Sequence, residues 1–135
     1  MIFVDTSAIF AGIDEADEAH QPARRQWVSL REARATLLSH SLVEIETAVL
    51  LQSRLGVDAL RTFQERFLPL ISVGEVDREG RRRAIAAVAH DDRRSLSIVD
   101  RVSFSFMRER GITTAFTFDR HFADAGFELI GADPA

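Results

Sequence analysis

The sequence predicts an α/β protein with a central parallel sheet, formed by one domain over residues 1–135. Short apolar runs rich in strand-forming residues alternate with longer segments of helical spacing, as they do in βαβ units. The length of 135 residues suits a single domain, and no repeat, low-complexity tract or linker divides it. Hydrophobic residues make up 46% of the chain, which is enough for a buried core.

The first forty residues predict two strands with two helices between them. Residues 2–4 are an apolar run that ends at Asp5, and Ser7 can cap a short helix after it. An acidic connection leads to a helix over residues 20–34, which has one apolar face. Residues 35–39 form the second predicted strand.

The middle of the chain predicts two helices and a third strand. Ser41 and Glu44 have the spacing of a capping box, which starts a helix that Gly56 ends. A further helix covers residues 58–67, because a proline shortly after it prevents its extension. Residues 70–73 form the third strand.

The last part predicts two long helices and two strands. Asp77 can start a helix that runs to residue 89, and Ser97 can cap a helix that runs to residue 110. Residues 113–118 and 127–130 form the fourth and fifth strands, with a one-turn helix around residues 121–125 between them.

Composition excludes several kinds of site and location. The chain has no cysteine, so it holds no disulfide, thiolate zinc site, iron–sulfur cluster or cysteine nucleophile. We expect no signal peptide and no membrane span, and we expect the protein in the cytoplasm. Glycine-rich phosphate loops, GxSxG and HExxH are also absent. The net charge of -4 argues mildly against a protein that coats duplex nucleic acid.

Four acids stand in largely apolar surroundings: Asp5, Glu46, Asp100 and Asp119. Taken singly, each aspartate has a structural interpretation as a helix cap, a first-turn acid or a turn residue. Glu44 belongs to the predicted capping box, whereas Glu46 has no capping role and is expected at or beside a buried face, where a carboxylate is costly.

Taken together, the acids predict a metal site. Asp5 ends the first strand and Asp119 follows the fourth, and ligands of parallel sheets bind beyond the carboxyl ends of the strands. Carboxylates crowded at that edge would repel one another and raise their pKa values. A divalent cation between them relieves the repulsion, and Mg²⁺ or Mn²⁺ takes oxygen ligands of this kind.

With these residues identified, the chain resembles the PIN-domain ribonucleases, particularly bacterial toxins of the VapC type. The resemblance covers nearly the whole chain and rests on four segments in the family's order: residues 4–8 (VDTSA), 41–47 (SLVEIET), 95–100 (SLSIVD) and 117–122 (TFDRHF). It implies a three-layer α/β/α fold and a hydrolase, a Mg²⁺- or Mn²⁺-dependent endoribonuclease that acts on RNA. It also implies a cognate antitoxin protein as partner and a homodimer.

The same resemblance assigns roles to individual residues. Asp5 and Asp100 look like the main metal ligands, and Glu46 and Asp119 look like the acids that complete the shell directly or through water. The bound metal would activate a water for in-line attack on an RNA phosphodiester. The residues that would orient these carboxylates and their waters are Thr6, Ser7 and Thr117.

The chain has 17 arginines and no lysine, and two sets of these arginines can be assigned a role. Residues 81–83 are expected on a solvated helix face. The arginines nearer the acidic edge are better candidates for holding RNA phosphates: Arg93, Arg94, Arg101 and Arg120. Trp27 and the ten phenylalanines are expected mainly in the core, and His121 is expected to make a local hydrogen bond or to touch the substrate.

Two other functions are open to a chain of this class. One is a non-catalytic PIN-like module that binds RNA or protein, although such a module has no need of four converging acids. The other is a phosphate-handling domain such as a receiver or a haloacid-dehalogenase-type phosphatase. The phosphatase needs a second aspartate after Asp5 and the receiver needs a lysine, and the chain has neither.

Overall fold

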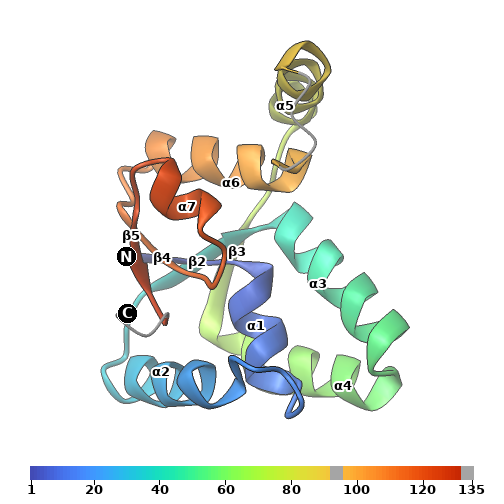
Figure 1. Cartoon of the computed structure of the whole chain (residues 1–135), viewed down its shortest axis with the longest axis vertical. Coiled ribbons are helices and arrows are strands. Elements are labelled where there is room, and N and C mark those ends of the chain that lie inside the picture. Colours follow the sequence, from blue (N-terminus) through green and yellow to red (C-terminus); the bar gives the residue numbers. More distant parts are fainter. Residues whose placement is uncertain (92–95, 132–135) are drawn as a thin grey trace.

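Five parallel strands form one sheet in the computed structural model, which describes residues 1–91 and 96–131. They are β1 (Ile2–Val4), β2 (Leu37–His40), β3 (Ile71–Gly74), β4 (Thr114–Phe116) and β5 (Glu128–Ile130). Their order is β3-β2-β1-β4-β5, so β1 lies at the centre between β2 and β4 (Figure 1). In register, Phe3 of β1 pairs with Leu38 on one side and with Ala115 on the other. The predicted parallel α/β class is confirmed.

The described residues form seven α-helices: α1 (Thr6–Ile13), α2 (His20–Glu32), α3 (Ser41–Arg54), α4 (Val57–Thr62), α5 (Arg78–Asp91), α6 (Ile98–Glu109) and α7 (His121–Asp124). None of the helices in these residues is both long enough and apolar enough to cross a bilayer.

Helices cover both faces of the sheet. Successive residues of a strand point to opposite faces, and apolar residues of β1 on each face pack against helices. Val4 lies in one buried cluster with side chains of α1 and α2, among them Ile9 and Trp27. Phe3 lies in a second cluster with side chains of α6 and α7, among them Phe122. Figure 1 shows α6 and α7 across the strands from α1 and α2, which gives the three α/β/α layers that the resemblance implied.

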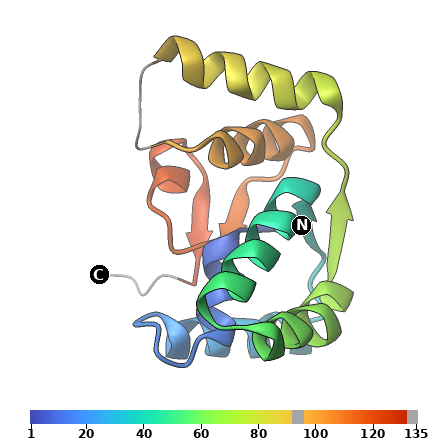
Figure 2. The ribbon, with the colours of Figure 1, turned by 90° about the vertical axis from the view of Figure 1, so that its right-hand side faces the viewer.

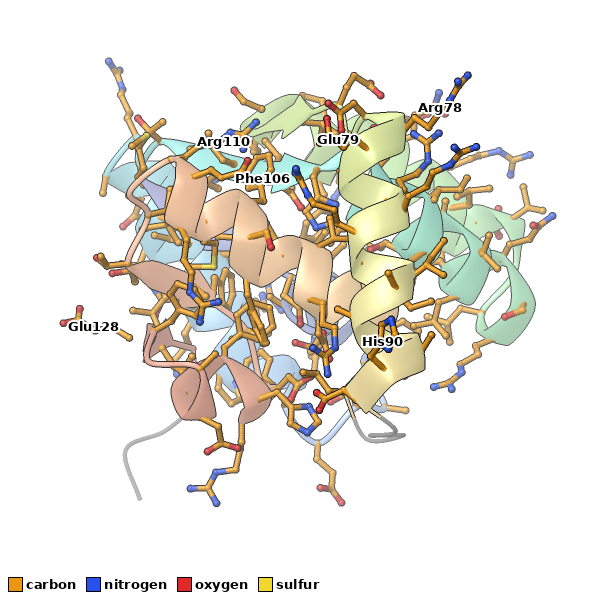
Figure 3. The ribbon with its side chains drawn as sticks, turned by 90° about the horizontal axis from the view of Figure 1, so that it is seen from above. Arg78, Glu79, His90, Phe106, Arg110 and Glu128 are labelled. Atoms are coloured by element: carbon orange, nitrogen blue, oxygen red, sulfur yellow. The ribbon has the colours of Figure 1, made fainter. Side chains whose placement is uncertain are left out.

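Helix α5 lies outside these layers. Its one buried side chain is Ala84, and its neighbour is α6 (Figure 2). Seen from above, α5 extends from Arg78 at one end to His90 at the other and lies at a steep angle to α6 (Figure 3). The guanidinium of Arg110 lies over the ring of Phe106, 3.6 Å from the ring centroid, near the end of α6.

Several predicted boundaries were wrong by one or a few residues. The second strand was expected at residues 35–39 and forms at Leu37–His40, and the third was expected at 70–73 and forms at Ile71–Gly74. The helix expected over residues 58–67 is α-helical only to Thr62. A π-helical turn over Phe63–Phe67 and a 3₁₀ turn over Leu68–Leu70 follow it.

Two predicted helix caps were wrong. Ser7 lies inside α1, whose N-cap position is Asp5, and the Asp5 side chain makes no capping hydrogen bond. Ser41 is the first residue of α3, and its hydroxyl accepts the Val76 N–H instead. His40 caps α3, so the expected capping box with Glu44 does not form.

Three other predicted helix ends are confirmed. The Asp77 carboxylate accepts the Gly80 N–H at the start of α5, and the Ser97 hydroxyl accepts the Asp100 N–H at the start of α6. Gly56 follows the end of α3 with a φ of 94°, a conformation that favours glycine.

Candidate active site

The candidate site lies at the carboxyl ends of β1 and β4. These strands are neighbours, but the chain continues from β1 toward β2 and β3, and from β4 toward β5 on the other side. Such a switch point opens a crevice at the sheet edge where ligands of α/β proteins bind. Asp5 follows β1 directly, and its backbone N–H donates to the Phe116 carbonyl at the end of β4.

Two hydroxyls hold the Asp5 carboxylate. Only 5% of Asp5 is exposed, and its Oδ2 accepts hydrogen bonds from Ser7 Oγ and Thr117 Oγ1, each at 2.9 Å. Each hydroxyl also accepts a backbone N–H, Ser7 from Phe118 and Thr117 from Asp119. Because those N–H groups occupy the hydroxyl lone pairs, the hydroxyl protons are directed at Asp5.

The bonds to Asp5 only partly offset its burial. Desolvation raises the pKa of Asp5 above its usual value, and repulsion from Asp119 raises it further, while the hydrogen bonds from Thr117 and Ser7 lower it. Asp5 is therefore oriented rigidly but is not neutralised by any positive group among its neighbours in the described residues.

Asp100 enters the same space from the first turn of α6. Burial raises its pKa from 3.8 to about 6, and the nearby carboxylates of Asp5 and Asp119 add to the rise. Two smaller effects lower it: the hydrogen bond with Ser97 and the charge of His121.

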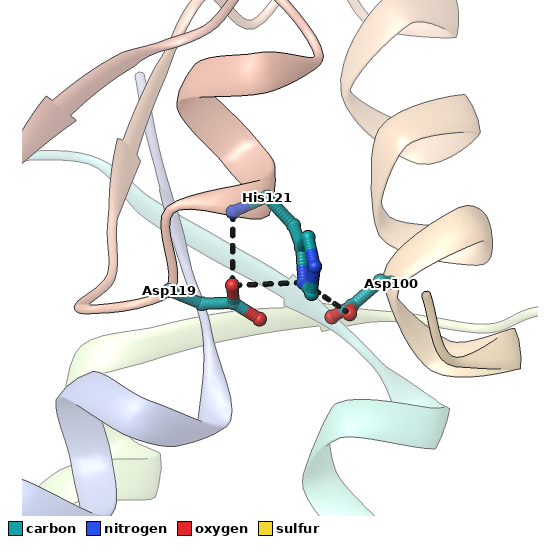
Figure 4. A group of neighbouring side chains, drawn as sticks. All are labelled: Asp100, Asp119 and His121. Atoms are coloured by element: carbon teal, nitrogen blue, oxygen red, sulfur yellow. Dashed lines mark hydrogen bonds and ion pairs between the residues drawn. The ribbon is translucent and has the colours of Figure 1, made fainter. Parts of the chain in front are cut away.

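Asp119 and His121 complete the group on the loop after β4. The Asp119 Oδ1 accepts the backbone N–H of His121 at 2.9 Å, and the His121 Nδ1 lies 3.0 Å from the same oxygen. The His121 Nδ1 also lies 3.8 Å from Asp100 Oδ2 (Figure 4). In the described residues, Asp100, Asp119 and His121 are the one group of acids and histidines with ligand atoms all within 4.8 Å of one another.

Glu46 lies at the open side of the site, on α3. Its pKa is raised by partial burial and by the charge of Asp5, and a hydrogen bond with Thr6 lowers it. The Thr6 hydroxyl itself receives a hydrogen bond from Thr47 at 3.1 Å. Glu46 was expected at or beside a buried face, and it lies beside one: its own side chain is exposed and that of the next residue, Thr47, is buried. In the described part of the chain, no hydrogen bond joins Glu44 to this cluster.

Comparison with known proteins decides the family, since residues 2–128 match the PIN domain. This chain belongs to the PIN-domain family. Two relatives of this PIN domain, from Mycobacterium tuberculosis strains CDC 1551 and H37Rv, are both named 23S rRNA-specific endonuclease VapC20. Each is 34% identical over 128 residues, which are 94% of this chain and 95% of the relative.

Solved structures agree with the family. The crystal structure of M. tuberculosis VapC20, described as a Sarcin-Ricin loop cleaving toxin, superposes with a TM-score of 0.81 at 32% identity. The match covers 99% of this PIN domain and 100% of that chain. FitAcB from Neisseria gonorrhoeae superposes with a TM-score of 0.66 at 14% identity, covering 96% of each chain, and supports the fold alone.

The donor set of this PIN domain fits a divalent cation. Carboxylates are the ligands that Mg²⁺ and Mn²⁺ take in proteins, and an imidazole nitrogen is a further metal ligand. The His121 Nδ1 atom is buried without a hydrogen-bond partner among the described residues, so it is available to a ligand between the acids. A cation there would also remove the repulsion that raises the carboxyl pKa values.

The arginines predicted to bind RNA do not form one cluster in the described residues. Arg93 and Arg94 lie outside the described residues. Arg101 pairs with Asp91 at the end of α5, in a cleft of about 640 Å³ between α5 and α6 that His121 also lines. Arg120 is exposed directly beside Asp119.

Sequence reasoning missed the position of His121. It was interpreted as a local hydrogen-bonding or substrate-contacting residue, and the structure places its ring between two acids. The signal was the spacing Asp119-Arg120-His121 in a tight turn, in which the aspartate binds the N–H two residues later and brings the two side chains together.

Proposed function

We propose that this PIN domain is a metal-dependent endoribonuclease that hydrolyses RNA phosphodiester bonds and acts as the toxin of a toxin–antitoxin pair. The observation that carries the proposal is the buried Asp5 carboxylate, oriented by two hydroxyls and facing Asp100 and Asp119 across the switch point of the sheet. Burial and the charges of neighbouring carboxylates raise the pKa of both Asp5 and Asp100, which is costly unless a cation lies between them.

In this proposal Asp5 and Asp100 hold Mg²⁺ or Mn²⁺, and Glu46 and Asp119 complete the shell directly or through water. When bound, the metal would polarise the phosphoryl group and increase the acidity of an attacking water. Ser7 and Thr117 fix the direction of the Asp5 carboxylate, and Thr6 holds Glu46 near Asp5. Glu46, which is open to solvent and has a raised pKa, is suited to accept the proton of the attacking water.

The names of the relatives suggest the first RNA to test. Because the two M. tuberculosis relatives are named 23S rRNA-specific endonucleases, we take 23S rRNA as the first substrate of this chain to be examined. The description of the VapC20 structure directs attention to the sarcin–ricin loop. Arg120 and Arg101, together with Arg93 and Arg94, are the proposed contacts to RNA phosphates.

The decisive experiment is cleavage of ribosomal RNA by the purified chain with Mg²⁺ or Mn²⁺, and with EDTA. We expect cleavage by the wild type, none in EDTA, and a loss of at least about 100-fold in Asp5→Asn and Asp100→Asn. Asp124→Asn is the matched control, because Asp124 is an exposed aspartate of α7. Cleavage by folded Asp5→Asn and Asp100→Asn at the wild-type rate would remove the site assignment.

The proposal includes an antitoxin, a homodimer and a cytoplasmic location, where the RNA substrate is found. An apolar surface on α3 supports a protein partner: Ile45 and Val49 are 58% and 57% exposed and line a shallow groove beside Glu46. Burial of such side chains drives association. Light scattering of the wild type and of Val49→Asp tests the homodimer. A wild-type chain that is monomeric at all concentrations contradicts it.

A further inference from the structure

We infer that the Nδ1 atom of His121 is a direct ligand of the metal, and that this imidazole makes the site prefer Mn²⁺ to Mg²⁺. The inference rests on the proposed function, because it concerns the metal of the same site. It adds a nitrogen ligand to a set that the sequence predicts as carboxylates alone.

Distances place His121 in the geometry of a ligand. Metal–oxygen distances in octahedral sites are about 2.1 Å, so ligand atoms on adjacent corners lie about 3 Å apart and those on opposite corners about 4.2 Å apart. The His121 Nδ1 lies 3.0 Å from Asp119 Oδ1 and 3.8 Å from Asp100 Oδ2. Both separations agree with these limits, and the ligand atoms of Asp100, Asp119 and His121 all lie within 4.8 Å of one another, so side-chain movements can bring all three to one ion.

The Nδ1 atom also lacks a hydrogen-bond partner among the described residues, although two carboxylates lie near it. It is buried, and although it lies near Asp119 Oδ1, it makes no acceptable hydrogen bond with any described residue. Leaving a buried polar atom unpaired is unfavourable. A cation between the carboxylates would provide the missing contact.

The backbone around His121 holds the ring in place. The His121 N–H donates to Asp119 Oδ1, and the next residue, Phe122, is completely buried against Phe3 and Phe104. The ring is therefore attached to a turn that the core anchors. Such support is what keeps a ligand at a fixed position.

The ligand chemistry gives the metal preference. Mg²⁺ favours oxygen ligands and retains waters, whereas imidazole suits first-row transition ions. Mn²⁺ accepts both carboxylate oxygen and imidazole nitrogen, so an Asp–Asp–His set favours it over Mg²⁺. Removing the imidazole should therefore weaken Mn²⁺ binding and leave Mg²⁺ binding nearly unchanged.

The test uses Mn²⁺ itself as the probe, without RNA. Pulsed electron paramagnetic resonance of Mn²⁺ bound to the EDTA-treated, dialysed full chain should show coupling to a nitrogen nucleus. We expect this coupling to disappear in His121→Asn and His121→Gln. The dissociation constant for Mn²⁺ should rise about tenfold or more, and that for Mg²⁺, measured by competition, should change less than about threefold.

His90→Asn is the matched control, because His90 is exposed at the C-terminal end of α5 (Figure 3) and is not one of the grouped acids and histidines. It should keep the nitrogen coupling and the Mn²⁺ affinity. Circular dichroism checks the folding of both His121→Asn and His121→Gln. Two variants are used so that one remains folded even if the site does not tolerate the other side chain.

The failures of the two proposals can be told apart. Mn²⁺ that binds in an Asp100-dependent manner but shows no nitrogen coupling overturns the role of His121 and leaves the metal site of the proposed function intact. Equal loss of Mn²⁺ and Mg²⁺ affinity in folded His121 variants also overturns the preference. A folded wild type that binds neither ion removes both proposals.

Discussion

Three carboxylates of the site are unfavourable in their charged form as long as no cation is bound, those of Asp5, Glu46 and Asp100. Burial and repulsion raise the pKa of Asp5, Glu46 and Asp100, the last from 3.8 to about 6. The folded state thus keeps the Asp100 proton to a higher pH than the unfolded chain does. The stability associated with this carboxyl is present below pH 3.8 and is lost as the pH rises to about 6.

Replacing Asp100 should therefore stabilise the metal-free protein. A shift of about two pKa units corresponds to roughly 3 kcal/mol, and we expect Asp100→Asn to raise the free energy of unfolding by on the order of 2 kcal/mol at pH 8. The gain should vanish near pH 4, where the wild-type carboxyl is protonated. Urea unfolding at both pH values, in EDTA, measures it, with Asp124→Asn as control. A gain that is the same at pH 4 and pH 8 would show that the buried charge of Asp100 is not its cause.

The two glutamates of α3 provide a second comparison between residues. Glu46 interacts with Thr6 and Asp5, whereas no described hydrogen bond joins Glu44 to the site. We expect Glu46→Gln to reduce RNA cleavage by about 100-fold or more with less than about 1 kcal/mol change in stability. Glu44→Gln is the matched control and should keep nearly full activity. Greater loss of cleavage in Glu44→Gln than in Glu46→Gln means that the two roles are reversed.

Residue positions that follow from strand ends could be predicted from the sequence, and those that depend on side-chain direction could not. Asp5 and Asp119 follow apolar strands, so their meeting at one sheet edge was foreseeable. The exposure of Glu46 depends on how α3 rotates about its axis. The sequence pattern does not determine this rotation when apolar residues occur on more than one face of a helix. This is the case for α3, in which the apolar residues Ile45 and Val49 are exposed.

At the scale of secondary-structure elements, His40 joins the helices that carry Glu46 and Asp100. Its Nδ1 accepts the N–H groups of Leu42 and Val43 at the start of α3, so the ring proton is on Nε2. Nε2 lies 2.8 Å from the Ser103 hydroxyl of α6, which in turn donates to the Val99 carbonyl. The ring is fully buried, and it therefore fixes α3 relative to the first turn of α6.

Removing this connection should cost more than an ordinary helix cap. A lost cap costs about 1 kcal/mol, and truncating a buried ring leaves a cavity that costs about 2–4 kcal/mol, so we expect His40→Ala to lose roughly 3 kcal/mol at pH 7.5. His40→Asn should lose less, because asparagine is a good N-cap but is too short to reach Ser103. Thermal or urea unfolding tests this order. Equal losses for the two variants would contradict a capping role.

The histidine cap also explains why the start of α3 was predicted wrongly. Ser41 and Glu44 match a capping box, but the Ser41 hydroxyl is taken by the Val76 N–H, which is 35 residues away in the sequence. A cap made by an aromatic ring that is itself held by α6 is a tertiary contact. The caps at Asp77 and Ser97 are local contacts, because each side chain accepts the N–H of the residue three positions later. Both of these caps were predicted correctly.

Across the whole molecule, the strand order decides which acids meet. Asp5 and Thr117 are 112 residues apart in sequence and 2.9 Å apart in space, because β1 and β4 are neighbours in the sheet. Alternating strands and helices predict a parallel sheet, but they leave the order of its strands open. The strand ends predicted that Asp5 and Asp119 meet, and the resemblance to the PIN family implied a role for each of the four acids in one site.

The whole molecule also balances two opposite effects of pH on folding. His40 is buried in its neutral form, and desolvation, with the charge of Arg110, lowers its pKa from 6.5 to about 4. Because the unfolded chain binds this proton at a higher pH than the folded chain does, stability from His40 is present above pH 6.5 and is lost as the pH falls toward 4. Asp100 acts in the opposite direction over an overlapping range.

Separating the two groups should therefore reveal slopes of opposite sign. We expect the stability of metal-free Asp100→Asn to fall more steeply than that of the wild type between pH 6.5 and pH 4.5, by on the order of 2 kcal/mol over this range. That of His40→Asn should fall less steeply or rise. Urea unfolding at half-unit pH steps in EDTA measures all three proteins. If the three curves of stability against pH are parallel, neither Asp100 nor His40 titrates with the shifted pKa that its burial requires. Other titrating groups would then give the wild-type curve its shape.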